Sequence, residues 1–284
     1  MQSISSPVVG FNPQVINLTN QTGCKITTFP DGEKHVTVDD LNRKIPVSIY
    51  CRITCADDLF CLMQVADVLK RQEMIIDHLF IGYMMSMRCD RLFDINRPFS
   101  LKLVADIINS VGALQVGIVE PHSTASLLKI KSSIGVMATM EYFYKEIIRP
   151  NENNLDIVAV LPDSGAISRY KPNGLPYIVC GKERDPETGK LLSFTVDAGE
   201  TECKDKDLFV LDDLCDGGGT FVGLAPKLRE LEPKSLSLLV THAIQLEGIK
   251  KVAEAYDHVY ITNSYKAWED EPLPENVTVF KVFK

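Results

Sequence analysis

Short runs rich in Val, Ile and Leu recur along the chain, and segments whose apolar residues follow a helical spacing lie between them. Helices are expected at 59–72 and at 98–111, where Gly112 provides a stop. Strands are expected at 47–50, 78–82, 116–119, 155–161, 177–179, 208–211, 236–240 and 259–262. Because apolar strands that alternate with helices are typical of parallel sheets covered on both faces, the pattern predicts an α/β fold.

The length of 284 residues is sufficient for two packed domains. A polar stretch that begins at Pro150, Pro-Asn-Glu-Asn-Asn, is the expected break between them. We therefore predict two α/β sandwich domains, 1–148 and 149–284. The segment 277–283 alternates apolar and polar residues, so it is expected to add an edge strand to either domain.

The composition excludes several classes of protein. The formal net charge of −8 argues against a nucleic-acid partner, which usually leaves a basic stripe. The N-terminal residues lack the features of a signal peptide, and no apolar run reaches the roughly 18 residues of a membrane span. The eight cysteines include no C-x-x-C pair, so we expect reduced thiols and no zinc site. A cytoplasmic protein without a nucleic-acid or membrane partner is predicted.

A glycine-rich segment gives the strongest local signal. The expected strand 208–211 runs into Asp212 and Asp213, and Gly217-Gly218-Gly219-Thr220 then opens a helix. Backbone N–H groups and the helix dipole at such a turn favour phosphate, and glycines allow close approach. The two carboxylates at the end of the strand suit ribose hydroxyls or a magnesium ion. Taken alone, the segment also fits a glycine-rich turn without a ligand.

The pattern D-D-x-x-D-x-G-G-T resembles the phosphoribosyl diphosphate (PRPP) signature shared by type I phosphoribosyltransferases and PRPP synthetases, also called ribose-phosphate pyrophosphokinases. The resemblance implies that Asp212 and Asp213 bind the ribose hydroxyls. It also implies a 5-phosphate site made by Asp216, Gly217, Gly218, Gly219 and Thr220.

Two further segments resemble the ATP side of the synthetases. Phe-Pro-Asp-Gly-Glu at 29–33 is similar to the family's F-[SP]-D-G-E, and the segment around R-C-D-R at 88–91 is similar to its R-Q-D-R. Taken alone, P-D-G is also a common turn sequence. The resemblance implies that ATP is bound by Phe29, Asp31, Glu33, Arg88 and Asp90.

The remaining matches concern metal and charge. Glu-Pro-His ending at His122 and Pro-Asp-Ser-Gly around Asp163 resemble the family's D-x-H and P-D-x-G-G, which implies that His122 and Asp163 bind magnesium with ATP. Lys182-Glu-Arg184 resembles the K-x-R at the root of the catalytic loop. Lys182 and Arg184 would offset charge at the transferred phosphorus, whereas alone the segment fits a solvated strand end.

The segments keep the family's order along the chain. The resemblance therefore implies two type I phosphoribosyltransferase-like domains, each a mostly parallel sheet flanked by helices, and Mg²⁺ as cofactor. The implied reaction moves the β,γ-diphosphate of ATP to the C1 hydroxyl of ribose 5-phosphate and gives PRPP and AMP. The implied assembly is a homo-oligomer, from dimer to hexamer.

The sequence departs from the family at several positions. Cys89 stands for a usual Gln, Ala166 for the second glycine of P-D-x-G-G, and Pro172 leaves little room for the usual helix. Gly217 replaces the Thr that closes the pocket on a terminal 5-phosphate. A larger acceptor whose 5-phosphate is esterified, such as ADP-ribose, would therefore fit as well. A type I phosphoribosyltransferase and a non-catalytic synthetase-associated protein are two competing interpretations of the same glycine-rich segment.

Overall fold

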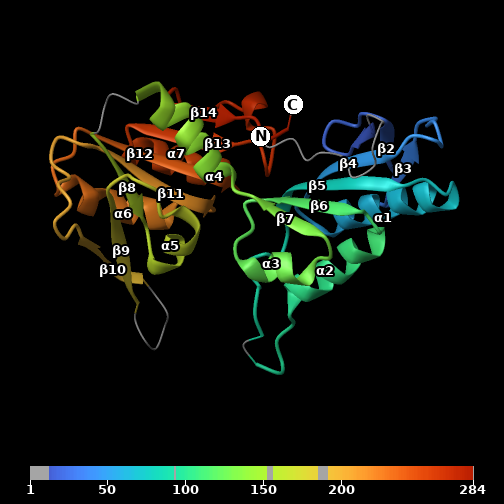
Figure 1. Ribbon diagram of the computed structural model, residues 1–284, viewed down its shortest axis with the longest axis horizontal. Coiled ribbons are helices and arrows are strands. Elements are labelled where there is room, and N and C mark those ends of the chain that lie inside the picture. The colour runs from blue at the N-terminus through green and yellow to red at the C-terminus, as the bar shows by residue number, and fades with distance from the viewer. Residues whose placement is uncertain (1–12, 93, 152–155, 185–190, 284) are drawn as a thin grey trace. The chain divides into compact units, whose positions relative to one another are not determined.

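The computed structural model describes residues 13–283 apart from 93, 152–155 and 185–190, and side chains at 151, 182–184 and 191–193 lie outside that description. The chain forms two compact units, residues 1–137 and 138–284 (Figure 1). The predicted boundary lay after residue 148. The units divide earlier because the segment after residue 137 packs on the second sheet, where the Phe143 ring lies 5.7 Å from that of Phe209.

The first unit is built on a five-stranded parallel sheet in the order β1-β4-β5-β6-β7. Its strands are β1 (Gln14–Asn17), β4 (Val47–Ile53), β5 (Ile76–Met84), β6 (Gln115–Val119) and β7 (Ser133–Val136). Its helices are α1 (Ala56–Arg71), α2 (Ser100–Val111) and α3 (Thr124–Lys129). β5 is buried along its whole length, as expected for a central strand of a covered parallel sheet.

The helix ends of the first unit follow from local chemistry. α2 stops at Gly112, which has a φ of 80°, a left-handed conformation that glycine adopts without strain. α1 begins next to Asp57 and Asp58 and ends at Lys70 and Arg71, so charged side chains complement its dipole at both ends. A separate antiparallel hairpin, β2 (Cys24–Thr28) and β3 (Lys34–Val38), packs beside α1.

The second unit has a seven-stranded sheet in the order β10-β9-β8-β11-β12-β13-β14. All neighbours are parallel except β10 and β9. The strands are β8 (Ile157–Leu161), β9 (Tyr177–Arg184), β10 (Leu191–Asp197), β11 (Asp207–Cys215), β12 (Ser235–Ala243), β13 (His258–Thr262) and β14 (Val277–Phe280). The edge strand expected near the C-terminus thus joins this unit.

Helices cover both faces of the second sheet. They are α4 (Ala138–Tyr142), the π-helix η1 (Phe143–Ile148), α5 (Ser164–Tyr170), α6 (Gly219–Arg229) and α7 (Leu246–Ala255), with short 3-10 turns η2 (Arg149–Asn151) and η3 (Trp268–Asp270). Leu208 and Val210 belong to the core that includes α6 and α7, whereas Phe209 faces Phe143. The α/β fold predicted from the pattern is confirmed. Within the described residues, no helix is long and apolar enough to cross a bilayer.

The strand order of the second unit reverses beside β8. From β8 the chain moves to β9 on one side, and it then returns to β11 on the other side. Such a switch point leaves a crevice at the carboxyl ends of the two strands, which is where open α/β sheets bind ligands. The carboxyl-terminal parts of β8 and β11 are therefore the expected ligand-binding region of this unit.

Asn263, directly after β13, holds the C-terminal segment. Its side-chain amide donates to the Phe283 carbonyl at 2.9 Å, and its oxygen accepts from the N–H groups of Val282 and Phe283 at 2.8 and 3.0 Å. The residue is only 2% exposed. Water therefore has little access to these groups if the side chain is removed.

Replacing Asn263 by Ala is expected to lower the free energy of unfolding by about 2–3 kcal/mol, because three buried backbone groups lose their partner. Urea unfolding measures the change. The exposed Asn96→Ala variant is the control and should unfold like the parent. A loss for Asn263→Ala no larger than for that control would show that the C-terminal segment adds nothing to stability.

Candidate active site

Three aspartates, carried by β11 and by the segment after β8, lie near the switch point. Asp163 lies two residues after the end of β8, and Asp212 and Asp213 lie in β11. The ladder between the two strands ends at the pair Val160 and Val210, so the acidic residues lie beyond it. Asp212 and Asp213 are 9% and 3% exposed. Two adjacent buried carboxylates are costly unless a cation or ligand compensates them.

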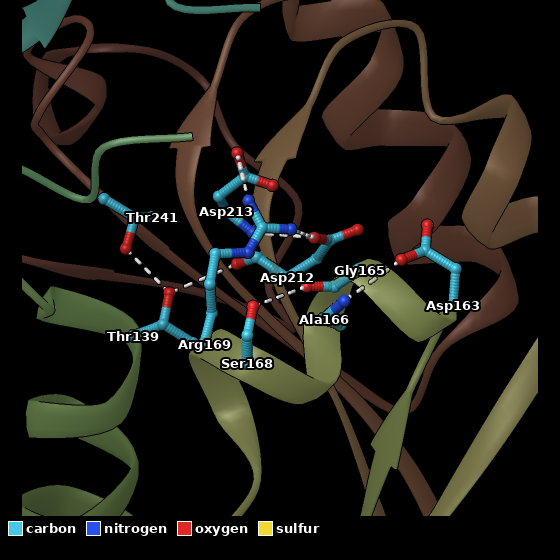
Figure 2. Close-up of polar contacts among 9 residues, drawn as sticks. All are labelled: Thr139, Asp163, Gly165, Ala166, Ser168, Arg169, Asp212, Asp213 and Thr241. Atoms are coloured by element: carbon cyan, nitrogen blue, oxygen red, sulfur yellow. Dashed lines mark hydrogen bonds and ion pairs between the residues drawn. The ribbon is translucent and has the colours of Figure 1, made fainter. Parts of the chain in front are cut away.

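Arg169 of α5 supplies that compensation, as Figure 2 shows. Its Nη1 lies 3.1 Å from Oδ2 of Asp213, and its Nη2 lies 3.5 Å from Oδ1 of Asp212. The arginine side chain is itself only 14% exposed. One guanidinium therefore bridges both carboxylates in a region with little water.

Burial, and then the charge of Asp213, raise the pKa of Asp212 well above its usual value, whereas the charge of Arg169 opposes that rise. The backbone of Asp212 is also held: its carbonyl accepts a hydrogen bond from the Thr139 hydroxyl at 3.1 Å, and Thr139 is bonded to Thr241 at 2.8 Å (Figure 2). The position of the acidic pair is thus determined by contacts from α4, α5 and β12.

The glycine loop after β11 packs against the start of α7. A Cβ atom on Gly248 would lie 2.1 Å from the Asp216 carbonyl oxygen, so only glycine fits there. Gly218 has a φ of 76° and caps the start of α6. The Gln245 side chain also donates to Oδ1 of Asp216 at 2.8 Å. These contacts determine the shape of the loop.

The other glycines of the loop face space. A Cβ atom on Gly217 or on Gly219 would have no neighbouring atom within 4 Å. Thr220 lies in the first turn of α6, half-buried. The loop therefore has one face fastened to α7 and one open face at the positive end of a helix, an arrangement that favours an anion.

Asp163 caps the helix from which Arg169 projects. Its Oδ1 accepts a hydrogen bond from the backbone N–H of Ala166 at 3.1 Å. α5 has only seven residues and ends just before Lys171 and Pro172. Proline after a helix prevents its continuation, which agrees with the limited room expected for this helix. The short helix joins Asp163 and the acidic pair through Arg169.

In the first unit, the 29–33 segment forms the tip of the β2–β3 hairpin. The N–H of Phe29 donates to the Glu33 carbonyl at 2.8 Å, and Oδ1 of Asp31 accepts from the N–H of Glu33 at 3.1 Å. Asp31 and Glu33 are exposed, and the Phe29 ring is 46% exposed. The segment is a tight turn, and it also presents an aromatic ring and two carboxylates to solvent.

Gln64 of α1 fastens this hairpin to the rest of the first unit. Its side chain accepts from the N–H of Val36 and donates to the carbonyl of Lys34, both at 2.8 Å. A side-chain amide that pairs with both backbone groups of one strand acts as an additional strand partner. The position of Phe29 therefore depends on α1 as well as on the turn.

Arg88, Asp90 and His122 lie after the carboxyl ends of neighbouring strands, β5 and β6. Arg88 is exposed, whereas Asp90 and His122 are half-buried. Partial burial works against ionisation of Asp90, but hydrogen bonding from Ser123 and then from Arg91, together with the charges of Arg91 and His122, outweighs it, so the pKa of Asp90 is lowered. Asp90 and His122 are thus electrostatic neighbours.

Glu120, just before His122, is fully buried and has a φ of 44°. A left-handed backbone is uncommon for a residue with a side chain, and such positions concentrate at functional sites.

Lys182 and Arg184 belong to β9 by their backbone, paired with Phe194 and Leu191 of β10. Their side chains lie outside the described part of the structure.

Sequence reasoning missed four residues of this site: Arg169, Thr139, Gln245 and Gly248. Arg169 follows Asp163 within the same short segment, and that proximity is the signal that could have indicated it. Within the described part of the chain, no group of three or more His, Cys, Asp or Glu side chains is arranged to hold a metal ion by itself. Mg²⁺ does not need such a group, because one or two carboxylates and substrate phosphates usually bind it.

A parallel sheet with an acidic pair and a glycine loop at its switch point, in a chain with a second α/β unit, defines a two-domain protein of the phosphoribosyltransferase-like class. A solved structure of phosphoribosylpyrophosphate synthetase from Mycobacterium smegmatis has the same fold, with a TM-score of 0.79 and 22% identity over 96% of this chain and 95% of that chain.

Curated relatives agree with this class. The ribose-phosphate pyrophosphokinase of Mycoplasma pneumoniae is 26% identical over 260 residues, which cover 87% of this chain and 77% of the relative. That of Hyphomonas neptunium is 27% identical over 278 residues, or 92% of this chain and 85% of the relative. No protein-family model matches the chain. The chain is thus similar to ribose-phosphate pyrophosphokinases over most of its length.

The raised pKa of Asp212 has a consequence for stability. A carboxyl whose pKa is higher in the folded than in the unfolded state favours folding when it is protonated, and this advantage is lost as the pH rises through the folded-state pKa. Asp212→Asn removes the buried like charge. The melting temperature is therefore expected to rise by about 2–4 °C at pH 8 and by less at pH 5, as measured by differential scanning calorimetry.

Asp257→Asn is the matched control, and its effect should have the opposite sign. Hydrogen bonding from Arg229 lowers the pKa of Asp257 despite partial burial, so the ionised form stabilises the fold above the unfolded-state pKa. Loss of that carboxylate should lower the melting temperature at pH 8. A drop at pH 8 for both variants would contradict the view that the Asp212 charge opposes folding.

Proposed function

We propose that this protein is a ribose-phosphate pyrophosphokinase, which transfers the β,γ-diphosphate of ATP to the C1 hydroxyl of ribose 5-phosphate and releases PRPP and AMP. The observation that carries the proposal is the acidic pair, Asp212 and Asp213, held beside the glycine loop at the switch point. The similarity of the chain to curated ribose-phosphate pyrophosphokinases supports the same proposal.

The second unit provides the acceptor site in this proposal. Carboxylates accept hydrogen bonds from vicinal hydroxyls, so Asp212 and Asp213 bind the 2′- and 3′-hydroxyls of the ribose. The 5-phosphate occupies the open face of the glycine loop, next to Gly217, Gly219 and Thr220, where helix α6 begins. Along the chain, the two carboxylates for the 2′- and 3′-hydroxyls come first and the loop for the 5-phosphate follows, which is the order of these substituents along the ribose.

The first unit provides the ATP site. The half-exposed ring of Phe29 offers a face for the adenine, and Asp31 and Glu33 offer acceptors for its amino group. Arg88 has the forked donors that suit phosphate, and it lies on an exposed turn. Asp90, ionised beside Arg91 and His122, completes this side of the site.

Mg²⁺ enters with ATP, and the proposed protein ligands are His122 and Asp163. Both lie at carboxyl ends of parallel strands and both are half-buried, which suits groups that contact a ligand-bound ion. Oδ1 of Asp163 is oriented by the N–H of Ala166. The ion would neutralise phosphate charge and orient the triphosphate for in-line attack.

The transfer needs positive charge near the β-phosphorus, because negative charge spreads over its oxygens as the bond to AMP breaks. Lys182 and Arg184 are the proposed donors of that charge. The electron pair for the new bond comes from the C1 hydroxyl, whose proton leaves as the bond forms, and the old bond's electrons leave with AMP. Positioning and electrostatics account for most of the expected rate enhancement.

We also propose that the protein acts in the cytoplasm as a homo-oligomer, between a dimer and a hexamer. All eight cysteines are free thiols, six of them buried, which fits a reducing compartment. Sedimentation velocity on the purified protein measures its assembly state.

A second acceptor class is favoured by one observation. The space beside Gly217 is open, where the related signature has a threonine that closes on a terminal phosphate. An acceptor whose 5-phosphate is esterified, such as ADP-ribose, would extend into that space. The reaction at C1 would be unchanged.

The function is tested by identifying products with mass spectrometry after incubation with ATP, Mg²⁺ and one acceptor at a time. PRPP and AMP from ribose 5-phosphate are expected. A pyrophosphorylated ADP-ribose alone would establish the second acceptor class instead. If no AMP forms with any acceptor, the proposal is overturned. A separate incubation with PRPP and a purine base, without ATP, tests the competing activity: consumption of PRPP there would indicate a phosphoribosyltransferase.

Lys182→Ala is expected to lower the turnover of ATP to AMP by roughly two or more powers of ten, because a cation that stabilises the transition state is lost. Steady-state kinetics at saturating substrates measure it. Lys204→Ala, which removes a lysine of an exposed ion pair with Glu232, is the control and should keep the parental rate. An unchanged rate in Lys182→Ala would remove Lys182 from the mechanism.

A further inference from the structure

The acidic pair is bridged by one arginine, and the form of the bridge is unusual for a purely stabilising contact. Stabilising arginine pairs are often bidentate to a single carboxylate, as for Arg229 and Asp257 at 3.0 and 2.9 Å. Arg169 instead uses Nη1 for Asp213 and Nη2 for Asp212. Its two contacts therefore set the spacing and the relative direction of two carboxylates.

The orientation of Asp212 is determined by two donors on one oxygen. Its Oδ1 accepts from the backbone N–H of Asp213 at 2.9 Å and lies 3.5 Å from Nη2 of Arg169. The Thr139 hydroxyl holds the carbonyl of the same residue. The carboxylate cannot rotate without breaking both contacts to Oδ1, so the direction of its second oxygen is determined as well.

Arg169 is itself held in place. Its guanidinium carbon lies 5.2 Å from the centre of the Tyr170 ring, and Tyr170 is fully buried. The helix that carries both begins at Asp163, whose side chain caps it. A short, capped helix with a buried final residue gives the guanidinium little freedom to follow a carboxylate that moves.

We propose that Arg169 is a positioning residue for the acceptor: it holds the carboxylates of Asp212 and Asp213 in the spacing and direction that receive the two ribose hydroxyls. The inference rests on the proposed function of this site. It assigns to α5 a task in sugar binding, although no atom of Arg169 needs to touch the sugar.

Electrostatics lead to the same role. Burial and the charge of Asp213 favour the protonated form of Asp212, which would be a poorer acceptor for hydroxyl groups, and the Arg169 charge opposes them. The other groups packed against Asp212 from α4 and β12, Thr139 and Thr241, are neutral, and Cys215 of β11 stays a thiol because burial raises its pKa to about 12. Among the described contacts, Arg169 provides the positive charge next to Asp212 and Asp213.

The test compares Arg169→Gln and Arg169→Lys with the parent, each as the full chain with ATP and Mg²⁺. For Arg169→Gln, the KM for ribose 5-phosphate should rise by roughly tenfold or more, while the KM for ATP changes by less than about twofold. The acidic limb of kcat/KM for ribose 5-phosphate should also move to higher pH, because the pKa of Asp212 rises further without the cation.

Arg169→Lys separates charge from geometry. A lysine ammonium keeps the charge but lacks the planar fork that spans two carboxylates, so the acidic limb should return toward that of the parent while the KM for ribose 5-phosphate stays raised. Arg229→Gln is the matched control: it removes an arginine from an aspartate in the same unit, and its KM values and pH profile should match the parent.

The outcomes distinguish this inference from the proposed function. A parent enzyme that makes PRPP, together with an unchanged KM for ribose 5-phosphate and an unchanged acidic limb in Arg169→Lys and Arg169→Gln, would overturn the positioning role alone. A parent that neither binds ribose 5-phosphate in titration calorimetry nor forms AMP would overturn both. If Arg169→Gln does not fold, the raised KM in folded Arg169→Lys supports the inference, and a parental KM there overturns it.

Discussion

Two neighbouring carboxylates buried in the C-terminal half of strand β11 are the constraint around which the second unit is arranged. Asp212 and Asp213 are almost inaccessible to solvent, and two such charges in a poorly hydrated place repel each other. The fold answers this repulsion with one guanidinium from α5 and with a hydroxyl that holds the backbone from α4. Apolar residues of similar volume would stabilise the fold at least as well as this buried charged cluster. Its presence is therefore better explained by a function of the pair than by a gain in stability.

Several other features can be understood as consequences of this constraint. The strand order reverses at β8, which places α5 beside β11. α5 is short, so a residue in its last turn can still reach back to the strand ends. Asp163 begins that helix and also belongs to the proposed metal site. One helix of seven residues thus connects the two chemical functions proposed for the second unit.

The sequence permitted prediction of the elements whose signal is local. Buried strands such as β5 and β11 were predicted from their apolar runs, and Gly112 indicated the end of α2. The glycine-rich pattern after an apolar strand, together with the family resemblance, indicated Asp212 and the glycine loop as a candidate site. The bridge made by Arg169 was not predictable in this way, because it depends on a tertiary contact 43 residues apart in sequence. The β2–β3 hairpin was also missed, since its strands are short and half-exposed, so their apolar pattern is weak.

The glycines near the loop differ in what substitution would do to them. Gly248 has a carbonyl oxygen where its Cβ would be, so any side chain there would push the loop away from α7. Gly217 has open space at the same position, so mutation can add atoms there without moving the backbone. Selection can therefore change the chemistry of the loop's open face independently of its shape. Substitutions at position 217 can therefore change which acceptor is bound during evolution, while the contacts at Gly248 keep the loop in its place.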